Sequence, residues 1–299
     1  MRFLRVLRGG ATPATSRHVL LPSRGRSLQA RRPKRNIVAK LIYIGGFGRS
    51  GSTLLEYLLT SNPDVVACGE VARHLRRLRT QKKCTCGVAA KDCAVWGPFQ
   101  IGPKRGEHFD HRTLTLTVLQ HVSADFGTMV DSSKTAWGSS LMPFGLRRNL
   151  GSDFLLVHIV RDPRGVCWST IKSSMRKRPQ AGTLYRCFKT TIGWTAANLA
   201  CELFGLFHRR QYVRIRYEDL VHDPGRAIQR ILHGKSWPPE QLEEGRNRHQ
   251  LYGNGVRFRP MSLSKLEEDL AWKVAMPEKY RLLAALTLPL AAKYGYFKS

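Results

Sequence analysis

Short apolar runs followed by glycine or polar residues recur along the chain. Continuous apolar runs are typical of strands buried on both faces of a parallel sheet, whereas alternation would indicate a half-exposed strand. Five runs predict strands at 41–44, 65–68, 129–131, 154–160 and 212–217. Leu54, Leu55, Leu58 and Leu59 predict a helix after the first run.

Helical stretches separate most of these runs, and strands that alternate with helices indicate an α/β fold. We expect three layers, with a mostly parallel central sheet of about five strands and helices on both faces. Residues 36–299 are long enough for a single domain of this kind.

Residues 1–35 read as a separate basic tail. They contain ten Arg or Lys residues and no acidic residue, and Gly and Pro interrupt them. Two interpretations are open: an organelle transit segment or a disordered basic extension. We predict a cytoplasmic protein, with an organelle as the alternative.

The charge narrows the choice of ligand. The net charge is +29, and about +19 remains after the tail is set aside. Such a surplus favours anionic ligands, including nucleotides, nucleic acid, acidic glycans and anionic membranes. No run of eighteen apolar residues occurs, so no membrane span is predicted.

The seven cysteines are few for a chain of this length, and their number is odd, so they do not indicate a secreted disulfide framework. Cys167, Cys187 and Cys201 lie in apolar or helical contexts and predict buried thiols.

Cys84, Cys86 and Cys93 form a cluster in the sequence. A four-ligand zinc site would need a histidine, and His74 or His108 would have to supply it from a distance. A structural loop or a redox-sensitive pair that includes Cys93 is the preferred interpretation, and no metal is predicted.

The segment at 45–53, with the sequence GGFGRSGST, lies between the first strand and its helix. Glycines let successive N–H groups point into one concavity, and a helix N-terminus adds partial positive charge. Ser50, Ser52 and Thr53 add hydroxyls and Arg49 adds a full charge. The segment predicts a phosphate-binding loop, with an ordinary turn as the alternative.

An ATP-binding P-loop is a second possibility. Gly46 and Gly51 have the separation of G-x-x-x-x-G-K-[ST], but Ser52 occupies the position of the required Lys. A small-molecule kinase, with Asp131 on Mg²⁺, therefore stays an alternative function.

Arg49 lies inside the loop, whereas the Lys of an ATP-binding P-loop would follow its last glycine, and this arrangement resembles that of a known family. Residues 48–55 resemble the 5′-phosphosulfate loop of sulfotransferases that use 3′-phosphoadenosine 5′-phosphosulfate (PAPS), P-[KR]-S-G-[ST]-[ST], with Gly48 in place of Pro. The resemblance implies a P-loop-NTPase-like fold. It also implies donor binding by a run of loop residues: Gly48, Arg49, Ser50, Gly51, Ser52 and Thr53.

Three further segments are similar to the same family. Arg161 and Ser169, in VRDPRGVCWS, match its 3′-phosphate segment. Tyr217, in RYEDL, matches a residue near the adenine, and Arg257, in GNGVRFR, matches a basic closing loop that contacts phosphates.

The resemblance also implies catalytic residues. Glu70 lies in NPDVVACGE, which is similar to the general-base segment of protein-tyrosine sulfotransferases. The alternatives are a helix-capping role for Glu70 and His74 as the base, whereas His158 reads as a core residue. Arg49 and Lys134 are the expected transition-state cations, unless Lys134 is a solvated surface charge.

The predicted reaction moves the sulfuryl group of PAPS to a hydroxyl acceptor and leaves adenosine 3′,5′-bisphosphate, with no metal required. The acceptor is a glycan, a glycolipid, a small alcohol or phenol, or a peptide tyrosine. A basic nucleic-acid-binding protein is another alternative, although no such motif occurs and no specific nucleic acid is expected.

Overall fold

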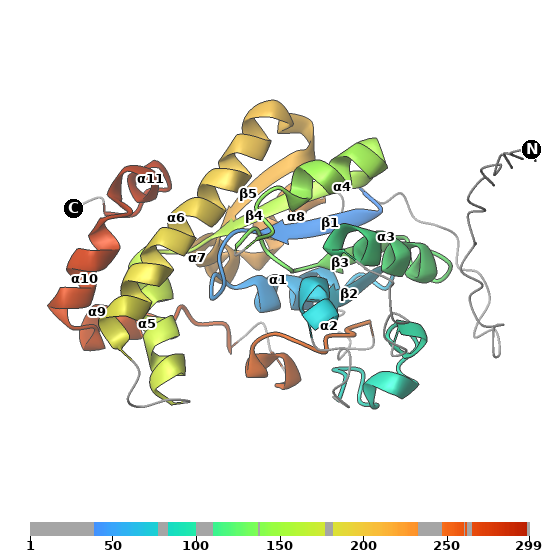
Figure 1. The fold of residues 1–299 in the computed structure, drawn as a ribbon, viewed down its shortest axis with the longest axis horizontal. Helices are drawn as coiled ribbons and strands as arrows, with labels where there is room; N and C mark the ends of the chain where they lie inside the picture. Colours follow the sequence, from blue (N-terminus) through green and yellow to red (C-terminus); the bar gives the residue numbers. More distant parts are fainter. Residues whose placement is uncertain are drawn as a thin grey trace, which may run out of the picture. The chain divides into compact units, whose positions relative to one another are not determined.

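The computed structural model describes residues 39–76, 83–99, 110–136, 138–176, 182–232, 247–259, 261 and 265–297 (Figure 1). All of them lie within one structural unit, Arg31–Ser299. The predicted tail at 1–35 lies outside the described residues.

Five parallel strands form the central sheet in the order β2-β3-β1-β4-β5. They are β1 (Leu41–Gly45), β2 (Val65–Gly69), β3 (Thr128–Asp131), β4 (Phe154–Val160) and β5 (Tyr212–Arg216). All five predicted strands are confirmed. Four of them differ from the predicted bounds by one residue at one end, and β5 ends a residue early because Tyr217 begins a helix.

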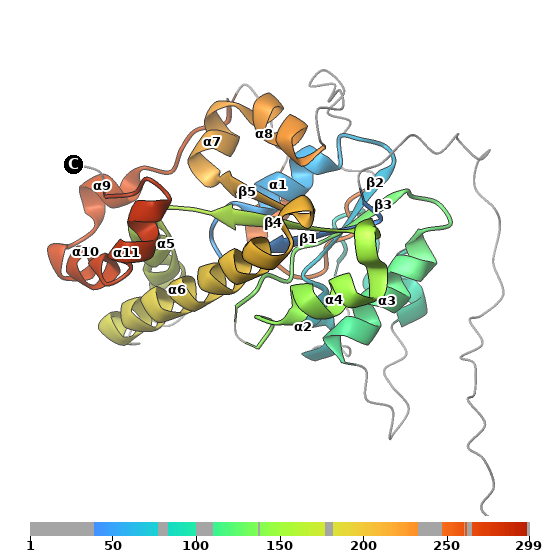
Figure 2. The ribbon, with the colours of Figure 1, turned by 90° about the horizontal axis from the view of Figure 1, so that it is seen from above.

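Helices cover both faces of this sheet, as Figure 2 shows. One face carries α3 (His111–Val122), α4 (Met142–Leu150) and α6 (Thr183–Phe207). The other face carries α1 (Ser52–Leu59), α7 (Tyr217–His222) and α8 (Pro224–Ile231). Leu41 and Tyr43 of β1 pack into the first layer, and Ile42 and Ile44 into the second. The predicted three-layer α/β class is confirmed.

The remaining helices lie beside or beyond these layers. They are α2 (Val71–Arg76), α5 (Pro163–Met175), α9 (Ala271–Ala275), α10 (Glu278–Ala285) and α11 (Leu288–Lys293). None of the described helices combines the length and the apolar character that a membrane crossing requires.

The strand order places β1 at the centre of the sheet. The chain goes from β1 to β2 and β3 on one side, then crosses to β4 and β5 on the other. Ligands of open α/β sheets bind beyond the carboxyl ends of the strands at such a reversal. The loop that follows β1 starts at this point.

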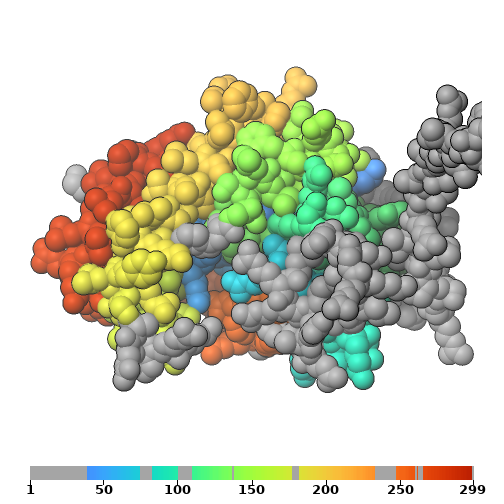
Figure 3. Space-filling model, viewed as in Figure 1, coloured from blue at the N-terminus to red at the C-terminus, as the bar shows by residue number. Residues whose placement is uncertain are grey.

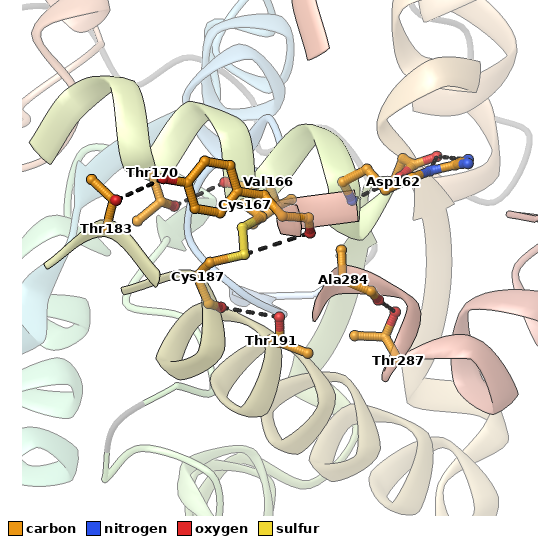
Figure 4. Close-up of a disulfide and its surroundings, with 11 residues drawn as sticks. Asp162, Val166, Cys167, Thr170, Thr183, Cys187, Thr191, Ala284 and Thr287 are labelled. Atoms are coloured by element: carbon orange, nitrogen blue, oxygen red, sulfur yellow. Dashed lines mark hydrogen bonds and ion pairs between the residues drawn. A yellow bond between two sulfur atoms is a disulfide. The ribbon is translucent and has the colours of Figure 1, made fainter. Parts of the chain in front are cut away.

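A disulfide joins Cys167 of α5 to Cys187 of α6 (Figure 4). The prediction of buried thiols is therefore wrong for this pair, whose two helices pack side by side; it is confirmed for Cys201, which is free and buried. Disulfides persist in oxidising compartments and are rare in the cytosol.

We expect the double substitution of Cys167 and Cys187 by Ser to lower the free energy of unfolding by about 3 kcal/mol, since the bond closes a loop of 20 residues. Urea unfolding of both proteins measures the change. Alkylation in denaturant with chelator and without reductant should label five of the seven cysteines. Seven labels would contradict the bond.

Candidate active site

The loop after β1 turns through left-handed backbone conformations. Gly46 has φ of 104°, Arg49 72° and Gly51 91°. A Cβ at Gly46 would lie 2.4 Å from the carbonyl oxygen of Ile159, and one at Gly51 would lie 2.6 Å from the ring of Tyr217. Glycine is therefore required at both positions, for conformation and for space.

The end of this loop offers donors to an anion. Ser50 is buried, and its hydroxyl has no hydrogen-bond partner within the described part of the chain. Ser52 begins α1, and its N-cap, Gly51, has no side chain that could cap the helix. The first amides of a helix have no partner within it and can donate to an anion. A Cβ at Gly48 would meet no atom within 4 Å, so the approach there is open.

Glu70 follows β2, and Lys134 follows β3, the neighbouring strand. The ammonium group of Lys134 donates to Oε1 of Glu70 at 2.7 Å and to the carbonyl of Ser132 at 3.0 Å. Lys134 is only 9% exposed, which excludes the solvated-charge alternative. Burial by itself would raise the pKa of Glu70, but Lys134 and then Arg73 outweigh it and hold that pKa below its ordinary value. Glu70 is therefore ionised at neutral pH.

Three guanidinium groups share the field of this carboxylate. Arg73, which sequence reasoning missed, pairs with Oε2 of Glu70. Burial lowers the pKa of Arg49, and Arg73 lowers it further while Glu70 opposes the shift. Burial also lowers the pKa of Arg257, with opposition from Glu70. The predicted residues Arg49, Glu70, Lys134 and Arg257 thus lie in one electrostatic group. The spacing of Arg73, one helical turn after Glu70, was the available signal.

The loop that carries Lys134 is held by buried Asp131. Oδ1 of Asp131 accepts from the amide of Ser133 at 2.8 Å, and Oδ2 accepts from the hydroxyl of Thr115 at 3.1 Å. The hydroxyl of Tyr43 donates to the carbonyl oxygen of Lys134 at 2.5 Å. Lys134 itself has φ of 68°, a conformation that such bonds must support.

The second predicted phosphate site lies at the ends of β4 and β5. The guanidinium of Arg161 lies 4.5 Å from the ring centre of Tyr217, and it pairs with Asp269 at 3.2 Å. It also donates to the carbonyl of Arg49 at 3.2 Å, which joins this group to the loop after β1.

Ser169 is half-buried on α5. It lies one turn before Ser173, whose hydroxyl accepts from Arg49 at 2.7 Å. Residues four apart share a helix face, so Ser169 lies on the face that meets the loop.

Two histidines take no part in this group. His158 is buried in β4 between Asn198 and Tyr212, where burial lowers its pKa to about 4, so its predicted core role is confirmed. The ring of His74 stacks on Trp96, and its Nε2 lies 3.4 Å from the carbonyl oxygen of Phe99.

Glu56 is a buried carboxyl group that sequence reasoning missed. It lies in α1 between Leu55 and Tyr57, and its Oε2 accepts from Gln250 at 2.7 Å. Burial raises its pKa to about 8, although Lys134 opposes the shift. A charged residue on an otherwise apolar helix face was the available signal.

Segments of the site lie close together at the surface. In Figure 3, blue and cyan atoms of the early chain are visible between the yellow region of α5 and α6 and the orange region near residue 250. By the colour bar, blue covers the loop after β1 and orange covers the chain near residue 250.

Comparison with known proteins agrees with the motifs. A model of the sulfotransferase family matches residues 152–239, which include Arg161, Ser169 and Tyr217. No curated protein matches the chain. The predicted resemblance to sulfotransferases is confirmed over this segment.

Two solved structures share the fold. The sulfotransferase domain of the olefin synthase from Synechococcus PCC 7002 is 18% identical, with 91% of this chain and 100% of that chain covered and a TM-score of 0.53. The sulfotransferase domain from the curacin biosynthetic pathway is 15% identical, with 88% and 99% covered and a TM-score of 0.54. At these identities the likeness establishes the fold.

We expect Glu56→Gln to make stability less dependent on pH. The pKa of Glu56 is 4.5 in an ordinary setting and about 8 in the fold, so the folded state retains a proton that the unfolded chain releases. Stability is therefore lost as pH rises between these values. Urea unfolding at a series of pH values should show that the free energy of unfolding of the variant increases relative to that of the wild type as pH rises through this window. A constant difference between the two would contradict the raised pKa.

Proposed function

We propose that this protein is a sulfotransferase that takes the sulfuryl group from PAPS and transfers it to a hydroxyl acceptor. The observation that carries the proposal is the group around Glu70. One ionised carboxylate lies among Lys134, Arg73, Arg49 and Arg257, beside a glycine-rich loop with unused donors.

Sulfuryl transfer needs a proton acceptor and cations. In the proposed reaction Glu70 takes the proton of the acceptor hydroxyl, whose oxygen forms a bond to sulfur. The bond between sulfur and the oxygen of the 5′-phosphate breaks, and adenosine 3′,5′-bisphosphate leaves. Arg49 and Lys134 stabilise the negative charge on the transferring group and on the leaving phosphate.

The ion pair with Lys134 has a consequence for the base. A carboxylate held to an ammonium group at 2.7 Å is a weaker base than a lone one. We propose that the bound donor draws Lys134 toward its own oxygens, which would raise the basicity of Glu70 when a hydroxyl is in place.

Arg161 and Tyr217 fit the nucleotide end of the same donor. A guanidinium group suits a phosphate that carries no metal, and an aromatic ring packs against a purine. Arg161 is anchored by Asp269, and Tyr217 packs on Gly51 of the loop. We propose that Arg161 and Ser169 bind the 3′-phosphate while Ser50, Gly51, Ser52 and Thr53 bind the 5′-phosphosulfate, with Gly48 at the open approach.

The alternatives receive less support. A P-loop kinase needs a Lys where Ser52 stands, and both oxygens of Asp131 already accept hydrogen bonds from neighbouring residues. A nucleic-acid-binding role rests on net charge alone. The acceptor is proposed only as a hydroxyl compound of the four predicted kinds.

We expect adenosine 3′,5′-bisphosphate to raise the melting temperature, since a ligand that binds only the folded state stabilises it, by about 2.7 kcal/mol at a hundred times Kd. ATP with Mg²⁺ and AMP should give smaller shifts in the same assay. Arg161→Ala should reduce the bisphosphate shift. A shift with ATP and Mg²⁺ but none with the bisphosphate would reject the proposal in favour of a kinase.

We expect Glu70→Gln to retain bisphosphate binding and to lower kcat by roughly a hundredfold or more, because the amide cannot accept the proton. Transfer of labelled sulfate from PAPS to a panel of hydroxyl acceptors measures turnover. Glu56→Gln is the matched control, since Glu56 is held protonated near neutral pH by burial. Near-normal turnover of Glu70→Gln would remove Glu70 from the role of base.

A further inference from the structure

Four metal-binding side chains converge outside the site described above. Cys84, Cys86, Cys93 and His249 each offer one ligand atom, and these atoms lie within 4.8 Å of one another. The three cysteines come from one short segment, whereas His249 lies 156 residues after Cys93. The sequence suggested only His74 or His108 as the fourth ligand. His74 stacks on Trp96 and is not among the four converging residues, and His108 lies outside the described residues.

The distances fit a tetrahedral ion. Sγ of Cys93 lies 3.7 Å from Sγ of Cys84, 3.8 Å from Sγ of Cys86 and 3.2 Å from Nδ1 of His249. Zinc–sulfur bonds of about 2.3 Å and zinc–nitrogen bonds of about 2.0 Å place two sulfurs roughly 3.8 Å apart, and a sulfur and a nitrogen roughly 3.5 Å apart. A disulfide would bring two sulfurs to about 2.05 Å.

Hydrogen bonds hold the backbone around the cluster. The indole N–H of Trp96 donates to the carbonyl oxygen of His249, and the amide of Cys84 donates to the carbonyl of Val88 at 2.8 Å. The amide of Gly87 donates to the carbonyl of Cys84 at 3.0 Å and closes a turn around the first two cysteines. Outer contacts of this kind orient the ligands of a metal site.

We infer that Cys84, Cys86, Cys93 and His249 bind one Zn²⁺ ion. The donor set of three sulfurs and one imidazole nitrogen is typical of zinc, and four protein ligands leave no open position for a substrate. Cys84, Cys93 and His249 are buried. The site is therefore structural, and the proposed transfer reaction itself still needs no metal.

The ion would fasten two distant segments at the edge of the sheet. His249 donates its backbone N–H to the carbonyl of Ala67 in β2 at 2.7 Å. The hydroxyl of Thr85 donates to the carbonyl of Arg248 at 2.7 Å and accepts from the amide of Gln250 at 2.8 Å. The zinc ligands thus reinforce a contact between the cysteine segment, the edge strand and the chain that leads to the active site.

The fastened chain carries a residue of the proposed site. Arg257 lies in the short helix Gly255–Phe258 and follows His249 by eight residues. Glu70 follows Ala67, the residue of β2 that His249 contacts, by three residues. If the proposed function holds, zinc keeps Arg257 close to Glu70. The metal site itself does not depend on that function, because its ligands do not include a residue of the transfer reaction.

Elemental analysis of the full-length protein, purified without chelator, tests the site. We expect about one zinc per chain. Replacement by Co²⁺ should give thiolate-to-cobalt charge-transfer absorption and the strong d–d bands of tetrahedral cobalt. If protein from zinc-supplemented medium contained no zinc and showed none of these bands after cobalt was added, the inference would be overturned. A disulfide from Cys93 to Cys84 or Cys86 in the native preparation, found by mass spectrometry, would also overturn it.

Variants assign the ligands. His249→Ala and Cys93→Ser should lose zinc and melt at a lower temperature, whereas the matched controls His74→Asn and Cys201→Ser should keep one zinc per chain. Retention of zinc by His249→Ala would overturn the assignment of His249. If the ligand variants do not fold, chelator titration of the wild type tests for the site instead. The chelator should lower the melting temperature, and added zinc should restore it. None of these readouts uses a nucleotide, so they fail or succeed independently of the transferase assays.

Discussion

Parallel hydrogen bonding of β1 to β3 and β4 is the constraint on which the site depends. Tyr43 is in register with Asp131, and Gly45 with His158, so the three strands end side by side. The loops that follow are then joined directly, since the amide of Gly46 donates to the hydroxyl of Thr135 at 3.0 Å. A shift of one residue in this register would move Lys134 away from the glycine-rich loop after β1.

Burial strengthens the electrostatic interactions at this edge of the sheet and also makes the charges costly to desolvate. An ion pair such as Glu70–Lys134 loses hydration when it is covered, and that loss can exceed the attraction between the partners. The conformations at Arg49 and Lys134 add to the cost, since both are left-handed at non-glycine residues. Each such position costs about 1 kcal/mol or more. Lys134 is buried and Arg49 is half-buried, and strain at charged residues of this kind is typical of a site maintained for function.

The disulfide and the proposed zinc site lie away from the centre of the sheet. The disulfide joins α5 to α6. The cysteine cluster joins the segment 84–93 to the chain near residue 249, which is hydrogen-bonded to the edge strand β2. These two links support the two sides of the site, since α5 carries Ser169 and the chain beyond His249 carries Arg257.

The sequence by itself determined the five strands and the glycine-rich loop after the first of them, because a continuous apolar run and a glycine-rich turn are local signals. The motif positions of Glu70, Lys134 and Arg161 could also be read directly, since each follows a strand. Only the tertiary structure decided the strand order, the proximity of His249 to Cys93 and the bond between Cys167 and Cys187. These relations join residues far apart in the chain, and no local pattern encodes the distance between them. The raised pKa of Glu56 belongs with them, because burial is a property of the packed fold.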